Sequence, residues 1–458
     1  MMKDKTAAGE LVDRLSAYIA ASGEAKLPEA VIKKTKHHIL DTLGAILCGS
    51  RLKPGRLAKE HVEKQGGAPE AQVAGSPVVT TAIHAAFAMA MMAHSDETDD
   101  SHERAGMHPG CGIVPAALAV ADREEADGLR FLKGVVAGYD VGCRITQALG
   151  VENVRRRALS LHGIGSNFGA AAAAASVLGL REGLVRYVWD YAAQQDSGKY
   201  YWVRDTDHVE KAFVFAAMGA RNGVTAAILV QSGFTGIADV FSGEHNYFES
   251  FSPIANRELL VEELGSRYEI QLTDIKKFSV GAPIQAPLDA LLILREKHGL
   301  NAANVQSMIA RVPDDRVMIV RDRNMPDVDL RHVLAVALID GGMTFAASHS
   351  YERMQDPAVL AVRERITLVG DPELRTARIK RGGIVEITTT DGAKLREHVE
   401  LVRGRPGNPM SDEEIEQKCT DLMGPVLGKE RTQKLIDRVW NLEKVKNVRD
   451  LRPLLSAS

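Results

Sequence analysis

The pattern of apolar and polar positions changes once along the chain, at about residue 265. Before that point apolar residues recur at the spacing of a helix, clearly so in the stretch 28–50. The stretches 110–121 and 167–180 are apolar almost all round, which predicts helices that lie among other helices. Their many alanines and glycines would let neighbouring backbones approach closely. The first 265 residues are therefore predicted to form an all-helical domain.

After that point short runs of β-branched residues are bounded by turn residues. These runs predict strands at 304–313, 364–371 and 382–401. The last run predicts a hairpin, because its apolar and polar residues alternate on both sides of Asp391–Gly392. Helical patterns at 283–296 and 332–348 lie between the predicted strands. Together they predict an α+β domain.

A glycine- and proline-rich stretch, 403–409, ends this domain. Helical pattern returns at Ser411, which forms a capping box with Glu414. The C-terminal helices are expected to rejoin the first domain. The sequence therefore predicts a mainly α protein, with an all-helical domain of residues 1–265 plus 404–458 and an inserted α+β lid domain of residues 266–403.

Composition excludes several classes of partner. The 458 residues carry a net charge of −3 with no dense basic stretch, which argues against nucleic acid. The longest apolar run, 169–180, is shorter than the roughly 20 residues that span a bilayer. The four cysteines show no paired spacing and the N-terminus has no apolar signal core, so a reducing, cytoplasmic location is expected.

One segment, 93–110, is dense in carboxylates and histidines and lies between two strongly apolar stretches. A solvated loop is the ordinary explanation for so polar a run. Here the flanking pattern places it at the ends of buried helices, where pKa values shift and acid/base chemistry becomes feasible. Three mechanisms fit: a divalent metal held by the cluster, magnesium and diphosphate as in isoprenoid synthases, or direct acid/base catalysis. The second metal motif that an isoprenoid synthase needs is not found in the sequence.

The segment from His94 to His102, followed by His108–Pro109, resembles the signature of the MmgE/PrpD family, H-x-x-D-x-D-D-T/S-H followed by a histidine–proline pair. The resemblance covers nearly the whole chain, including the stretches 40–50, 161–180 and 210–236. It implies a dehydratase, decarboxylase or epimerase that works at the carbon next to a carboxylate of a small organic acid, with hydro-lyase activity first among these. It also implies a large helical domain, a smaller α+β lid, a site between them, a homodimer, and no cofactor or metal.

The resemblance assigns roles residue by residue. It implies catalytic roles for His108, His162, Lys211, Asp99 and Ser101. It implies substrate contacts for Glu97, Asp100, His102 and for Lys276 or Lys277. In this assignment His108 and His162 act as acid and base in an order that the sequence leaves open, and Lys211 stabilises the enediolate. Either Asp99 or Asp100 orients a histidine.

The chain departs from the family pattern in the lid. Ala282 and Gln285 stand where relatives carry arginine and histidine, and the stretch 329–332 replaces a tyrosine motif, with Arg331 or His332 as possible substitutes. Fewer lid cations suggest a substrate with fewer carboxylates than a tricarboxylate.

The aromatic segment 200–207 has two explanations. It either covers the organic acid and pairs its carboxylate with Arg204, or forms an amphipathic helix whose aromatics enter the core.

The sequence leaves three functional hypotheses in order. The first is a lyase or epimerase that needs no cofactor. The second is a metal-dependent enzyme that uses the His94–His108 cluster. The third is an inactive relative that serves as a binding subunit.

Overall fold

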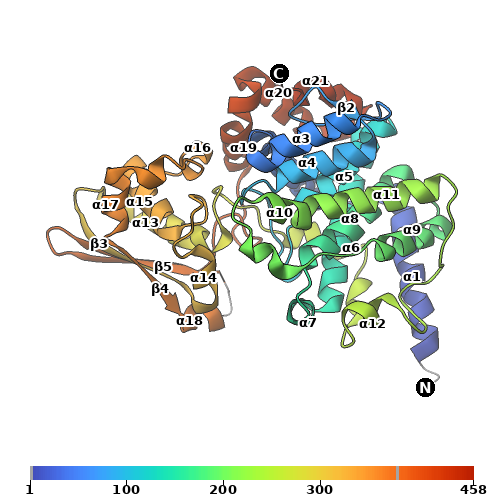
Figure 1. Cartoon of the computed structure of the whole chain (residues 1–458), viewed down its shortest axis with the longest axis horizontal. Coiled ribbons are helices and arrows are strands. Elements are labelled where there is room, and N and C mark those ends of the chain that lie inside the picture. Colours follow the sequence, from blue (N-terminus) through green and yellow to red (C-terminus); the bar gives the residue numbers. More distant parts are fainter. Residues whose placement is uncertain (1–3, 378–380, 458) are drawn as a thin grey trace. The chain divides into compact units, whose positions relative to one another are not determined.

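A computed structural model describes residues 4–377 and 381–457 of the chain. The chain divides into two compact units (Figure 1). The helical unit contains the chain up to Ser95, Asp99–Asp274 and the part from Asp412 onward, and the mixed unit contains Asp96–Thr98 and Ile275–Ser411. The predicted fold class, mainly α with a smaller α+β domain, is confirmed.

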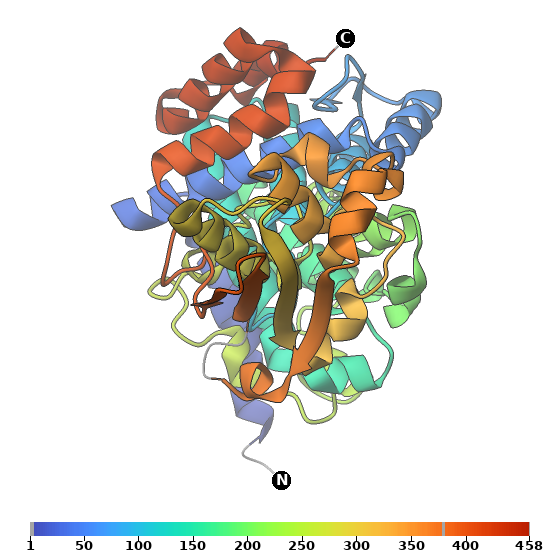
Figure 2. The same cartoon turned by 90° about the vertical axis from the view of Figure 1, so that its left-hand side faces the viewer.

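The helical unit is built from helices that bury most of their surface. The longest are α2 (Glu29–Gly49), α6 (Gly128–Leu149) and α8 (Leu161–Leu178), and every residue of α8 before its last is buried. After the mixed unit the chain returns, and α19 (Asp412–Leu427) packs against α2 (Figure 1, Figure 2). The other elements are α1 (Asp4–Ala21), α3 (Lys53–Gln65), β1 (Ala71–Gln72), β2 (Val79–Thr80), α4 (Ala82–Ala93), α5 (Gly110–Arg123), α7 (Val151–Arg156), α9 (Glu182–Gln194), α10 (Val209–Ala212), α11 (Met218–Gln231), α12 (Tyr247–Phe251), α20 (Lys429–Trp440) and α21 (Arg452–Leu455).

Helices α6 and α8 cross with their backbones almost in contact. Glycines recur every four residues on α6, and two of them meet backbone atoms of α8. A Cβ atom at Gly138 would lie 2.8 Å from the carbonyl oxygen of Gly169, and one at Gly142 would lie 2.6 Å from that of Gly165. No larger residue fits at these points without moving a helix.

The mixed unit contains a four-stranded sheet in the order β4-β3-β5-β6. Strand β3 (Val305–Pro313) runs parallel to β4 (Ile366–Asp371) and antiparallel to β5 (Gly383–Thr389), and β6 (Lys394–Val399) pairs with β5 as a hairpin. Helices α13 (Gln285–His298) and α15 (Leu330–Asp340) cover one face of the sheet and share its apolar core (Figure 1). The remaining helices of the unit are α14 (Val317–Val320), α16 (Phe345–Ser348), α17 (Pro357–Arg363) and α18 (Pro372–Thr376).

The predicted strands and the hairpin at Asp391–Gly392 are confirmed. The single helix predicted over 332–348 is wrong, because α15 ends at Asp340. Gly341 there adopts a left-handed conformation with φ of +83°, and the chain resumes as the short helix α16. A glycine at the position after a helix stops it in this way.

One helical run in the described part of the chain, Val209–Gln231, is long and apolar enough to cross a membrane by length and composition. About three quarters of its most apolar window, 72%, is buried inside the protein, as in the core helix of a soluble protein. All four cysteines are buried thiols, as the sequence indicates.

The contact between α6 and α8 predicts a large penalty for one methyl group. Gly142→Ala is expected to lower the free energy of unfolding by about 1–3 kcal/mol, because its Cβ would overlap the Gly165 carbonyl. Gly183→Ala in α9 is the control, since its Cβ would meet nothing within 4 Å, and it should raise stability by about 0.5–1 kcal/mol. Urea unfolding measures both, and equal stability of the two variants would contradict the close approach.

Candidate active site

Four histidine side chains of the helical unit gather around the ring of Phe215. His162 stacks on this ring at 3.5 Å between centroids and His94 at 4.4 Å, while His108 lies 5.5 Å away. His208 is 5.3 Å from the ring of His94. These five residues are called the histidine cluster below.

The ends of buried helices bring the histidine cluster together. His94 directly follows α4, His108 lies two residues before α5, and His162 is in the first turn of α8. His208 precedes α10 with a left-handed φ of 64°. Phe215 lies in a π-helical turn, Phe213–Ala217, a distortion that often marks functional sites.

Asp99 joins two members of the cluster. Its carboxylate oxygens lie 2.8 Å from Nδ1 of His94 and 3.1 Å from Nδ1 of His108, and its side chain is completely buried. A carboxylate next to Nδ1 favours the ring form in which Nδ1 carries the proton. Proton exchange by His108 is then assigned to Nε2.

His162 is in a different electrostatic situation. Burial lowers the pKa of His162 well below its usual value, and the positive charges of His108, His94 and Lys211 add to this effect. Among the described residues Nδ1 of His162 has no hydrogen-bond partner. A neutral imidazole at pH 7 has the properties of a general base.

Lys211 and Trp202 extend the cluster. The ammonium of Lys211 lies 5.1 Å from the centroid of Phe215 and 5.7 Å from that of Trp202. The Trp202 ring stands edge-on to Phe215 at 4.5 Å and to His162 at 5.7 Å. The cation and an aromatic wall therefore lie beside the two catalytic candidates.

The segment 200–207 does not form the amphipathic helix considered from the sequence. Residues Tyr200–Arg204 make one 3₁₀ turn in which no side chain is buried, so the alternative with aromatics in the core is wrong. Arg204 lies over the Tyr201 ring at 5.7 Å, and no described contact joins it to the histidine cluster. Only Trp202 of this segment reaches the cluster.

Other residues of the acidic motif are engaged elsewhere in the helical unit. Asp100 accepts hydrogen bonds from His38 at 2.7 Å, from Tyr139 at 2.6 Å and from the Gly110 amide at 2.9 Å. Burial and the charge of Lys34 lower the pKa of His38 to about 4.

The remaining two motif residues also contact protein groups. The His102 ring lies 3.0 Å from Glu269, and Ser101 forms a two-residue bridge with Asp274.

The predicted site residues of the mixed unit also contact protein groups. Lys276 donates to the Glu97 carbonyl at 2.8 Å, and Lys277 lies 3.2 Å from Asp289. The Gln285 amide donates to two backbone carbonyls at 2.8 and 2.9 Å. His332 caps the start of α15 through its backbone, and its buried Nε2 has no partner among the described residues.

Three donors of the helical unit have the spacing of a metal site. One ligand atom each of His94, Asp99 and Cys111 lies within 4.8 Å of the other two, and all three residues are buried. Imidazole, carboxylate and thiolate together suit Zn²⁺.

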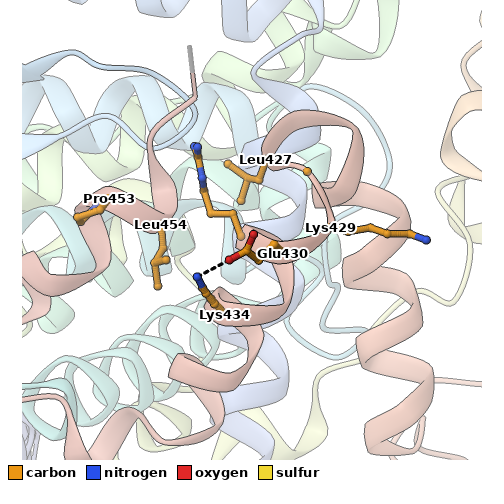
Figure 3. A pocket seen from close by; sticks show the side chains of 8 residues that line it. Leu427, Lys429, Glu430, Lys434, Pro453 and Leu454 are labelled. Atoms are coloured by element: carbon orange, nitrogen blue, oxygen red, sulfur yellow. Dashed lines mark hydrogen bonds and ion pairs between the residues drawn. The ribbon is translucent and has the colours of Figure 1, made fainter.

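A surface pocket of about 490 Å³ lies at the C-terminal helices α20 and α21 (Figure 3). Its lining includes the Lys434–Glu430 ion pair and Leu427, Pro453 and Leu454 (Figure 3). It contains none of the predicted site residues, so the site is defined by the histidine cluster.

Sequence reasoning missed three members of this arrangement. Phe215 and His208 flank Lys211 in the stretch 208–215, where only the lysine was selected. His94 opens the acidic motif but was not assigned a role. The spacing of His94, Asp99 and His108 was the one available signal.

Comparison with known proteins gives a consistent result. The model of the MmgE/PrpD N-terminal domain matches residues 13–259, and that of the MmgE/PrpD C-terminal domain matches residues 278–442. The chain is 22% identical to the Aspergillus oryzae protein named cis-aconitate decarboxylase-like protein oryM, over 99% of this chain and 98% of that one. It is 24% identical to the Homo sapiens cis-aconitate decarboxylase, over 94% and 91% of the two chains.

The lowered pKa of His162 predicts how stability depends on pH. The unfolded ring binds a proton near pH 6.5 and the folded ring only at lower pH, so the folded protein loses stability as pH falls below about 6.5. His162→Asn is expected to remove about 1 kcal/mol of the stability lost between pH 7.5 and 5.5. Urea unfolding at the two pH values measures this. The exposed His298→Asn serves as control and should behave as wild type. An unchanged loss in His162→Asn would contradict a neutral His162.

Proposed function

Given that this chain belongs to the MmgE/PrpD family, we propose that it is a lyase acting at the carbon next to a carboxylate of a small organic acid. Dehydration is the first candidate reaction and decarboxylation the second. The observation that carries the proposal is the pairing of two histidines of opposite character. Their ring centroids are 5.4 Å apart, one ring is buried with a lowered pKa, and the other is held by Asp99.

The two environments assign the roles that the sequence leaves open. His162 is the base, because burial and the surrounding cations keep it neutral. His108 is the acid, because the carboxylate of Asp99 next to Nδ1 favours its charged form. The acid donates from Nε2.

In a dehydration, His162 takes the proton from the carbon next to the carboxylate. The electron pair of that C–H bond forms the carbon–carbon double bond, the neighbouring C–O bond breaks, and His108 protonates the departing hydroxyl, which leaves as water. Charge develops on the substrate carboxylate in the enediolate-like state, and the Lys211 ammonium beside Phe215 stabilises it. A decarboxylation uses the same groups, with His108 protonating the carbanion that loss of CO₂ leaves.

The names of the relatives support a lyase, and cis-aconitate is the first acid to test. The mixed unit supports a substrate with fewer carboxylates than this tricarboxylate. The Gln285 amide is occupied by backbone carbonyls, and Arg331 pairs with Asp322, so neither residue replaces the cations missing from the family pattern. An epimerase, in which only the proton moves, uses the same first step.

Proton NMR in D₂O tests the reaction with a panel of mono-, di- and tricarboxylic acids. We expect loss or exchange of the proton next to one carboxylate in at least one acid. His162→Ala and His108→Ala should each slow it by about 10²–10⁴-fold, the usual contribution of a general acid or base. His298→Asn, an exposed histidine far from the motif in sequence, should react at the wild-type rate. A reaction unaffected by both alanine variants would contradict the proposed pair.

A metal-dependent enzyme is the second candidate, and the donor set of His94, Asp99 and Cys111 favours it. The two candidates predict different results after dialysis against a chelator. We expect full activity afterwards and an unchanged rate in Cys111→Ser. One equivalent of zinc by elemental analysis, lost together with activity in Cys111→Ser, would establish the second candidate instead.

A further inference from the structure

The acidic motif passes from one compact unit to the other for only three residues. Ser95 and Asp99 belong to the helical unit, whereas Asp96–Thr98 belong to the mixed unit. Two basic side chains of the mixed unit hold this three-residue segment. His349 Nε2 lies 2.8 Å from Asp96 Oδ2, and Lys276 donates to the Glu97 carbonyl at 2.8 Å.

Only the second of these contacts involves residues predicted from the family signature. Asp96 occupies a variable position of that signature, between His94 and the acidic residue Glu97. His349 follows α16, more than 250 residues later in the chain, and no motif marks it. The Asp96–His349 pair is therefore a feature of this chain that the signature does not specify.

The His349 ring is held on both nitrogens and on one face. Nδ1 lies 2.9 Å from the Phe345 carbonyl oxygen and 2.9 Å from Ser348 Oγ. The Phe345 ring stacks on the imidazole at 4.1 Å between centroids. Because Nδ1 donates to a carbonyl, the ring offers Asp96 a hydrogen at Nε2 only as the imidazolium.

Charge and burial agree with an ionic pair. Burial lowers the pKa of His349, but the hydrogen bond and charge of Asp96, with the charge of Asp327, outweigh it and raise that pKa to about 9. Asp96 also accepts hydrogen bonds from the backbone amide of Thr98 at 3.0 Å and from its hydroxyl at 2.5 Å. The Asp96 carboxylate thus fixes both the turn of its own segment and the segment's attachment to His349.

We propose that His349 is a positioning residue, which holds the 96–98 segment through Asp96 and thereby sets the place of Asp99. Asp99 comes directly after this segment and carries His94 and His108. Three residues of chain reach at most about 10 Å, so a displaced Asp96 moves the start of the stretch that presents Asp99. A buried ion pair adds little net stability compared with apolar residues, which suits a role in positioning.

This role rests on the proposed function only for its effect on the reaction, so the test has a readout that needs no substrate. Hydrogen–deuterium exchange of the full-length protein reports directly on the amides of the stretch 94–102. His349→Gln and Asp96→Asn should each raise the exchange rate of these amides by about tenfold, and the double variant should resemble either single one. His398→Gln, which alters another histidine of the mixed unit near a glutamate, should leave the stretch unchanged.

Kinetics on the acid identified by NMR complete the test. We expect kcat to fall by about tenfold in His349→Gln with KM within about twofold, because acid/base geometry changes while binding groups remain. Thr98→Val removes one hydrogen bond to Asp96 and serves as a milder variant that keeps the test valid if the others do not fold. Faster exchange in this stretch with no turnover in the wild type would support the positioning and count against the proposed function.

Unchanged exchange in 94–102 together with unchanged kcat, even with a lowered melting temperature, would overturn the proposal and leave the pair a structural contact.

Discussion

Four carboxylates lie within the five residues 96–100, and all four are buried. A carboxylate removed from water without a partner is so costly that it takes up a proton instead. Each of these groups therefore needs a donor or a cation, and the fold supplies a different one every time. The partners are His349 for Asp96, Lys276 for Glu97, His94 and His108 for Asp99, and His38, Tyr139 and the Gly110 amide for Asp100.

This requirement explains why so short a stretch determines so much of the structure. Its partners come from α2, α6, the start of α5 and two separate parts of the mixed unit. Removing one partner of a buried pair typically costs about 3–5 kcal/mol, because the other charge stays behind without compensation. The positions of the partner side chains are therefore fixed with the run, and those that belong to the site are fixed with them.

Local patterns in the sequence predicted much of the fold. Helical spacing identified the buried helices, and alternation around Asp391–Gly392 identified the β5–β6 hairpin. Both signals depend on neighbours in sequence and survive without tertiary information. The break at Gly341 was missed because an isolated glycine is also tolerated inside a helix.

The site was predictable as a group of residues and not as a geometry. The motif and the family resemblance selected His108, His162 and Lys211, which the structure does bring around Phe215. Sequence spacing left Asp99 and Asp100 equivalent, although one carries two histidines of the cluster and the other binds the start of α5. Partners such as Phe215 and His349 are set by packing between distant segments, which no local pattern records.

The difference between these two aspartates leads to the chemistry. Asp99 gives His108 a negative neighbour, whereas His162 shares the same aromatic ring and has positive charges around it. The charge of a protonated His108 lowers the pKa of His162, so the pair holds one proton more readily than two. One proton on two imidazoles is the state in which a lyase cycle begins, with an acid and a base present together. In this protein that state depends on which side of a single buried carboxylate each histidine occupies.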